Sequence, residues 1–115
     1  MTDKRSKQRI KVDVPCRCVA FGFPQTDFYT SIINLGPNGL AILSNTALSI
    51  NQEVEIHIDL KKERIEFKVK IVNCETVKIP QHYIVRAKII HVSPSDEKRY
   101  FEFYLRHLAS VKSGE

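Results

Sequence analysis

The sequence has little of what disulfide-bonded, membrane-spanning or secreted proteins require. Three of its 115 residues are cysteine, and Cys16 and Cys18 fall on one face of a predicted strand, so we expect reduced thiols rather than a disulfide framework. No apolar run approaches the roughly 20 residues of a membrane span. The polar N-terminus has no apolar segment typical of a secretory signal. We therefore expect a single cytoplasmic domain with no membrane span.

Catalytic and metal-binding patterns are also missing. The C-x-C spacing of Cys16 and Cys18 is shorter than the C-x-x-C of zinc sites, so both are predicted to be small, buried core residues. His57 is predicted to lie on the surface, and no nucleophile or orienting partner can be placed beside it. We predict that the protein is not an enzyme and that it uses no metal and no cofactor.

Positive charge is concentrated near the N-terminus. The net charge is +5, and five of the 18 basic residues fall in the first eleven positions, which favours an anionic partner. Residues 1–9 are interpreted as a flexible basic tail and residues 10–115 as the folded domain. A nucleic acid is the less favoured partner, because single-strand binders expose aromatic platforms and aromatic residues are few in the predicted strands.

Alternating apolar and polar residues predict six strands. The pattern is clearest in residues 10–21 and 53–60, where nearly every second residue is apolar. Within residues 65–77 the apolar parity flips between Ile71 and Val72, which predicts a β-bulge and a bent strand. The remaining strands are predicted at residues 28–35, 40–43 and about 83–89.

A change of period predicts a C-terminal helix over about residues 94–111. Ser93 suits the N-cap and Pro94 the first helical position. Four apolar residues then recur at i, i+3, i+4 and i+7 and are predicted to face the core: Phe101, Tyr104, Leu105 and Leu108. Because a closed sheet hides its strand edges, the predicted fold is all-β, a six-stranded antiparallel barrel with a C-terminal α-helix.

Two short motifs lie beside the first two predicted strands. Arg5-Ser-Lys-Gln-Arg9 has the form R-x-x-x-R, and Asn34-Leu-Gly-Pro-Asn-Gly39 has the form N-x-G-x-x-G at a strand end. Alone, the second motif is a turn over Gly36–Gly39, with proline and asparagine at its central positions. R-x-x-x-R alone is nearly uninformative, so the hypothesis depends on the order and separation of the two motifs.

In this order the two motifs resemble those of the PilZ domain family, the bacterial receptor module for cyclic di-GMP. The family pattern is D/N-x-S-x-x-G, and Gly36 stands where the family has serine. The resemblance implies a six-stranded barrel with a C-terminal helix. It also implies that Arg5 and Arg9 hold phosphate and guanine from a segment that orders on binding. In the family, a basic residue directly before the arginine pair is associated with binding of two stacked ligands, and Lys4 occupies this position here.

The residue types suit this ligand. Arginine pairs bidentately with phosphate or guanine, and two arginines four apart on an extended segment are at most about 13 Å apart at roughly 3.3 Å per residue. The amide oxygen of Asn34 can accept from guanine N–H groups, and Gly39 permits a close backbone approach or a positive φ. The serine hydroxyl missing at Gly36 removes a contact worth about 1 kcal/mol.

Two hypotheses of different classes follow. The first is a non-catalytic receptor that signals to a downstream protein partner by ligand-induced ordering. Its predicted ligand-binding residues are Lys4, Arg5, Arg9, Asn34, Gly36 and Gly39. The second is a PilZ-like protein–protein interaction module that does not bind nucleotide. Gly36 favours the second hypothesis, and the arginine pair argues against it.

Overall fold

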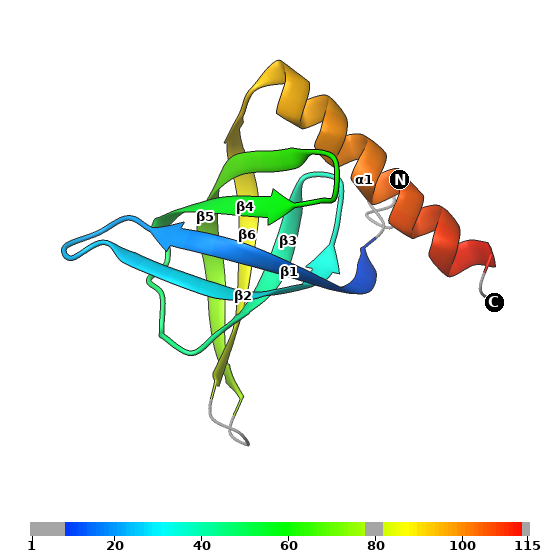
Figure 1. Cartoon of the computed structure of the whole chain (residues 1–115). Coiled ribbons are helices and arrows are strands. Elements are labelled where there is room, and N and C mark those ends of the chain that lie inside the picture. Colours follow the sequence, from blue (N-terminus) through cyan, green and yellow to red (C-terminus); the bar gives the residue numbers. More distant parts are fainter. Residues whose placement is uncertain (1–8, 78–81, 114–115) are drawn as a thin grey trace, which may run out of the picture.

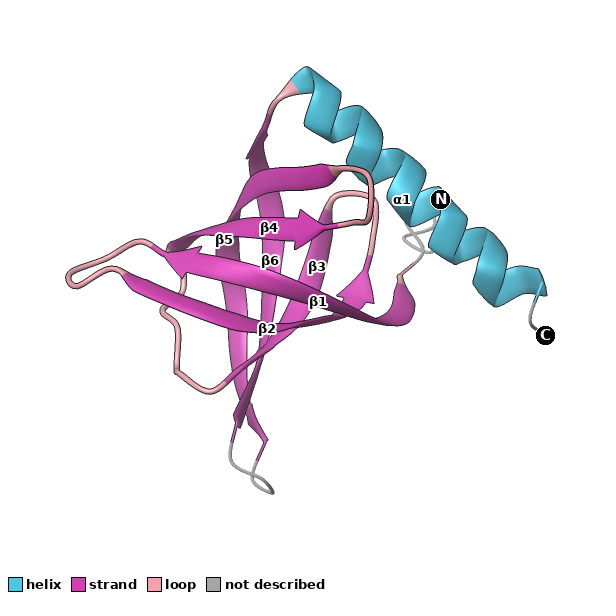
Figure 2. Cartoon of the chain, in the orientation of Figure 1, coloured by secondary structure: helices cyan, strands magenta, loops and turns pink. Residues whose placement is uncertain are grey.

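The computed structural model describes residues 9–77 and 82–113 and forms a closed antiparallel barrel with one helix (Figures 1 and 2). Around the barrel the strands follow the order β1-β2-β3-β6-β5-β4, and β4 pairs with β1 to close the sheet. The predicted fold class is therefore confirmed. The elements are β1 (Ile10–Ala20), β2 (Thr26–Leu35), β3 (Gly39–Ser44), β4 (Glu53–Asp59), β5 (Arg64–Val77), β6 (His82–Val92) and α1 (Pro94–Ser113).

The barrel forms because alternate residues of its strands are apolar and turn inward. In β4, Val54, Ile56 and Ile58 have no exposed surface, whereas the residues between them are partly exposed. The same alternation places Cys16 and Cys18 of β1 inside the barrel. Both are free thiols, and their sulfur atoms are 3.9 Å apart. Their predicted burial is confirmed. The hydrogen bond to Cys16, together with burial, raises the pKa of the Cys18 thiol.

Bulges bend the long strands. The pairing of β5 with β6 shifts register between Ile71 and Asn73, which confirms the bulge predicted from the parity flip. A second shift on the same pair lies between Lys68 and Val69. Such bulges increase local twist and let a strand of 14 residues curve around a small barrel.

The helix α1 begins where its capping residues predict. Ser93 Oγ accepts a hydrogen bond from the backbone N–H of Asp96 at 3.2 Å, as an N-cap does. From there α1 extends along one side of the barrel and contacts β5 and β1 (Figure 1). Within residues 9–77 and 82–113, no helix combines the length and the apolar character needed to cross a membrane.

The predicted core-facing side of α1 is right for Tyr104 and Leu108 but wrong for Phe101 and Leu105. Its buried residues are Tyr100, Phe103 and Tyr104, whereas Phe101 is 48% exposed and Leu105 43% exposed. Residues 100–108 offer two overlapping apolar stripes, and local periodicity does not choose between them. The choice is made by tertiary contacts of Tyr100, described below.

His57 also departs from its predicted surface position. Its side chain is only 13% exposed and lies between two carboxylates of β4 and β5. His57 Nε2 is 2.9 Å from Glu55 Oε1, and Nδ1 is 3.3 Å from Glu66 Oε2, without hydrogen-bond geometry at the second contact. Strand pairing sets Glu66 opposite His57, and the Glu66 side chain covers the imidazole. His57 is therefore largely shielded from solvent although it is on the outward-facing side of β4.

Candidate ligand-binding site

The turn Gly36–Gly39 joins β2 to β3 and is held by two backbone hydrogen bonds and by the Tyr100 hydroxyl. Within the turn, Gly36 N donates to Gly39 O at 2.9 Å. From β6, Ile89 N donates to Asn38 O at 2.9 Å. From α1, the buried Tyr100 hydroxyl donates to Gly36 O at 2.6 Å and lies 3.3 Å from Gly39 O. The turn is thus hydrogen-bonded both to the sheet and to the helix.

Tyr100 carries the connection between α1 and the turn. Its ring packs edge-on against Phe67 of β5, with 5.1 Å between the ring centroids. Burial raises the pKa of the Tyr100 hydroxyl above its ordinary value near 10, and the nearby positive charge of Arg9 opposes part of that rise. The hydroxyl therefore stays protonated and remains a hydrogen-bond donor at neutral pH.

Gly39 is required by a close approach and not by its backbone angle. A Cβ at this position would lie 2.7 Å from the carbonyl oxygen of Ala87 on β6, closer than any side chain tolerates. No glycine among the described residues has a positive φ. Of the two reasons that the sequence allowed for Gly39, the close backbone approach is the one that holds.

Arg9 lies over the same turn. It directly precedes β1, its side chain is exposed, and a Cβ at Gly36 would be 3.3 Å from Arg9 Cγ. Arg9 and the turn line a groove of about 290 Å³ together with Val72, Ala87 and two basic residues of β6. The structure thus brings together three of the predicted site residues, Arg9, Gly36 and Gly39. Lys4 and Arg5 lie outside the described residues.

Arg86 and Lys88 are the arginine and the lysine of β6, and neither belongs to a motif that the sequence reveals. They alternate with the buried Val85 and Ala87, so both point outward on the same face of the strand. Lys88 pairs with Gly39 on one side and with Lys70 of β5 on the other. We call the surface formed by Arg9, the turn, Arg86 and Lys88 the cationic groove.

Electrostatics make the cationic groove suited to an anion. Lys88 is paired with Lys70 on the neighbouring strand β5. Like charges on directly paired residues repel each other unless an anion lies between or beside them. Arg86 is partly neutralised, because its Nη1 is 3.1 Å from Glu75 Oε1. Arg9 and Lys88 make no ion pair with a carboxylate of the described residues. A phosphate in the groove would find two cations without a competing partner.

Asn34 is placed differently from the other motif residues. It lies on β2 between Lys11 of β1 and Ala41 of β3, and it does not line the cationic groove. Its Oδ1 atom is buried and has no hydrogen-bond partner among the described residues. A buried acceptor without a donor is costly, so this amide is stabilised by any donor that reaches it.

Comparison with known proteins decides the family. The model of the PilZ domain matches residues 3–107, nearly the whole chain. The chain belongs to the PilZ domain family. No curated protein matches its sequence at a significant level.

Solved structures of PilZ proteins share the fold at low sequence identity. The PilZ domain of Escherichia coli YcgR with c-di-GMP has a TM-score of 0.72 at 15% identity, over 98% of this chain and 99% of that chain. MrkH of K. pneumonia in complex with c-di-GMP has a TM-score of 0.77 at 12% identity, and Bacillus subtilis MotI one of 0.74 at 14%. These two matches cover 100% and 95% of this PilZ domain, but only 57% and 53% of MrkH and MotI.

Proposed function

We propose that this PilZ domain is a non-catalytic receptor for cyclic di-GMP and that the cationic groove binds the ligand's phosphates. The observation that carries the proposal is the meeting of Arg9, the Gly36–Gly39 turn, Arg86 and Lys88 in one groove. The YcgR and MrkH structures that share the fold contain c-di-GMP, which supports the same ligand for this chain.

Each group has a role that follows from its chemistry. Arg9 offers a planar fork that pairs bidentately with a phosphate or stacks on a guanine, and Lys88 offers a point charge beside it. The close approach at Gly39 keeps the groove floor smooth, because a side chain there would displace the turn from β6. Asn34 supplies an acceptor for guanine N–H groups once its side chain turns toward the ligand.

The tail completes the proposed site. Arg5 would add a second guanidinium from the segment before Arg9, and Lys4 would favour a stacked pair of ligands. Ordering of this segment on binding is the proposed signal to a downstream protein partner. The cytoplasmic location expected from the sequence stays a prediction. Limited trypsin digestion with and without cyclic di-GMP tests the ordering step, because bound ligand should protect the bonds after Lys4 and Arg5.

Calorimetric titration of the intact chain at physiological salt tests the ligand. We expect binding of cyclic di-GMP in preference to GTP and to the linear dinucleotide. Arg9→Ala and Arg5→Ala should each weaken binding by about 1.5–3 kcal/mol, roughly ten- to a hundredfold, the scale of hydrogen bonds to charged groups. Asn34→Ala should weaken it less, because a neutral acceptor is lost.

The β6 cations have a matched control. Lys88→Ala should weaken cyclic di-GMP binding and reduce its salt dependence, whereas Lys61→Ala removes the same charge from an exposed loop outside the groove and should have little effect. If both variants weaken binding equally, only the net charge matters and the groove is not the site.

The alternative function is a PilZ-like protein interaction module without nucleotide. Gly36, where the family has serine, is the feature that favours it. An absence of heat up to millimolar cyclic di-GMP would make this alternative the better hypothesis.

A further inference from the structure

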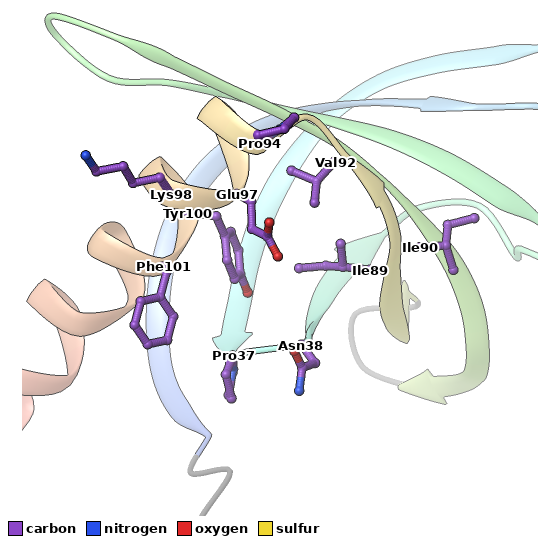
Figure 3. A pocket seen from close by; sticks show the side chains of 10 residues that line it. All are labelled: Pro37, Asn38, Ile89, Ile90, Val92, Pro94, Glu97, Lys98, Tyr100 and Phe101. Atoms are coloured by element: carbon purple, nitrogen blue, oxygen red, sulfur yellow. The ribbon is translucent and has the colours of Figure 1, made fainter.

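A second hollow lies on the other side of the same turn. It is a cavity of about 610 Å³ between the first turns of α1 and the end of β6, which we call the α1–β6 cavity. Ile89 and Val92 of β6 line one side, and Phe101 of α1 lines another (Figure 3). Pro37 and Asn38 of the turn line both this cavity and the cationic groove. A ligand bound in the groove can therefore extend over the turn into the cavity.

The α1–β6 cavity contains a carboxylate beside apolar walls. The Glu97 side chain points into the cavity, whereas that of Lys98 extends away from it (Figure 3). Within the described part of the chain, the Glu97 carboxylate has neither an ion pair nor a side-chain hydrogen bond. Its negative charge repels a phosphate, so the cavity suits an uncharged part of an anionic ligand that donates hydrogen bonds.

Guanine has the donors that this carboxylate needs. Its N1–H and N2–H₂ groups lie side by side on one edge, and the two oxygens of a carboxylate accept from both. Adenine has an acceptor at N1, so this atom would face the acceptor oxygens of Glu97 without forming a hydrogen bond. The flat faces of a base fit against apolar side chains such as Ile89 and Phe101, which a phosphate or a ribose does not need.

We propose that the α1–β6 cavity binds one guanine of cyclic di-GMP, with Glu97 accepting from N1–H and N2–H₂ and Phe101 contacting the base. This inference rests on the proposed function, because it places a second part of the same ligand. It makes Glu97 a residue that determines base specificity, separate from the arginine pair and from the N-x-G-x-x-G turn.

Titration of the intact chain with three cyclic dinucleotides tests the proposal. The ligands are cyclic di-GMP, cyclic di-IMP, which lacks both N2 amino groups, and cyclic di-AMP. Glu97→Gln should weaken cyclic di-GMP binding about tenfold, the scale of lost hydrogen bonds to a charged group. It should also shrink the preference for cyclic di-GMP over cyclic di-IMP. Glutamine pairs with the adenine edge, so the relative affinity for cyclic di-AMP should rise.

A matched control separates base recognition from helix stability. Glu97 lies in the first turn of α1, where a negative charge also stabilises the helix. Glu102→Gln removes the same charge from an exposed position of α1 outside the cavity and should leave all three affinities unchanged. A variant that only lowers the Tm does not alter the ratios between the affinities for the three ligands. Phe101→Ala should weaken the binding of all three ligands.

The outcomes distinguish the two proposals. If the wild type binds cyclic di-GMP through Arg9 but Glu97→Gln leaves the three affinities and their ratios unchanged, the cavity is no base site and only this inference fails. An equal loss for all three ligands would also overturn it, because Glu97 would then act on something other than the base edge. If the wild type binds no cyclic dinucleotide, the proposed function itself fails.

Discussion

Tyr100→Phe removes the hydroxyl through which α1 hydrogen-bonds to the Gly36–Gly39 turn. The hydroxyl donates to Gly36 O at 2.6 Å, and phenylalanine keeps the ring and its edge-on contact with Phe67. Gly39 O retains the hydrogen bond from Gly36 N, so Gly36 O is the carbonyl that loses its donor. Gly36 is buried, and an unsatisfied buried carbonyl costs about 1–3 kcal/mol.

Thermal and urea unfolding measure this cost. For a chain of 115 residues the loss corresponds to a fall in Tm of roughly 5–15 °C, and the urea m-value should not change. Affinity for cyclic di-GMP should fall as well, because the turn is no longer held in place. Tyr83→Phe is the matched control, since this half-buried tyrosine has no hydroxyl hydrogen bond among the described residues.

The pH dependence provides a second measurement. The folded state raises the pKa of Tyr100 above its ordinary value near 10, so the folded state holds the proton more tightly than the unfolded chain. This contribution is fully present below about pH 10 and is lost as the pH rises beyond it. Wild type should lose more stability above about pH 10 than Tyr100→Phe does. Equal stability of the two proteins at neutral pH would refute the role assigned to the hydroxyl.

The glycines and cysteines give further predictions. Gly39→Ala should lower stability by about 1–3 kcal/mol and weaken cyclic di-GMP binding, because the backbone carbonyl of Ala87 lies 2.7 Å from the new Cβ; unchanged unfolding curves would contradict this geometry. Gly36→Ser should fold normally and tighten binding by up to about 1 kcal/mol, whereas lower affinity with a lower Tm would mean that the family's turn geometry does not apply. In native thiol labelling, the half-buried Cys74 should react first and the two β1 thiols much more slowly; rapid reaction of all three thiols would contradict their burial.

The barrel could be predicted because its information is local. Alternation within β4 marks which residues face inward, and the parity flip at Ile71 and Val72 marks the bulge, without any knowledge of the neighbouring strands. The phase of α1 could not be predicted in this way. Tyr100 is buried, and Phe101 exposed, because the Phe67 ring and Gly36 O, both distant in sequence, provide partners for Tyr100 alone.

The residues of the candidate site could be predicted only in part, for the same reason. The motifs identify Arg9 and the turn, because each is a pattern within a few residues. Arg86 and Lys88 enter the site only through the pairing of β3 with β6, which sets Gly39 opposite Lys88. Outward basic residues on a strand are common, so their sequence positions alone carry no signal. Knowledge of the strand order would have been enough to find them.

The glycine at position 36, where the family has serine, is in contact with the side chain of Arg9. A Cβ on residue 36 would be 3.3 Å from Arg9 Cγ, slightly closer than an ordinary van der Waals contact, and 3.4 Å from Gly39 O, at the lower limit of such a contact. The absence of a side chain therefore lets the aliphatic part of Arg9 lie directly on the turn. A serine would require Arg9 to move by a few tenths of an ångström, which a flexible side chain does at little cost. A serine at position 36 therefore fits beside Arg9 and adds its hydroxyl to the groove, which is why Gly36→Ser is expected to tighten binding.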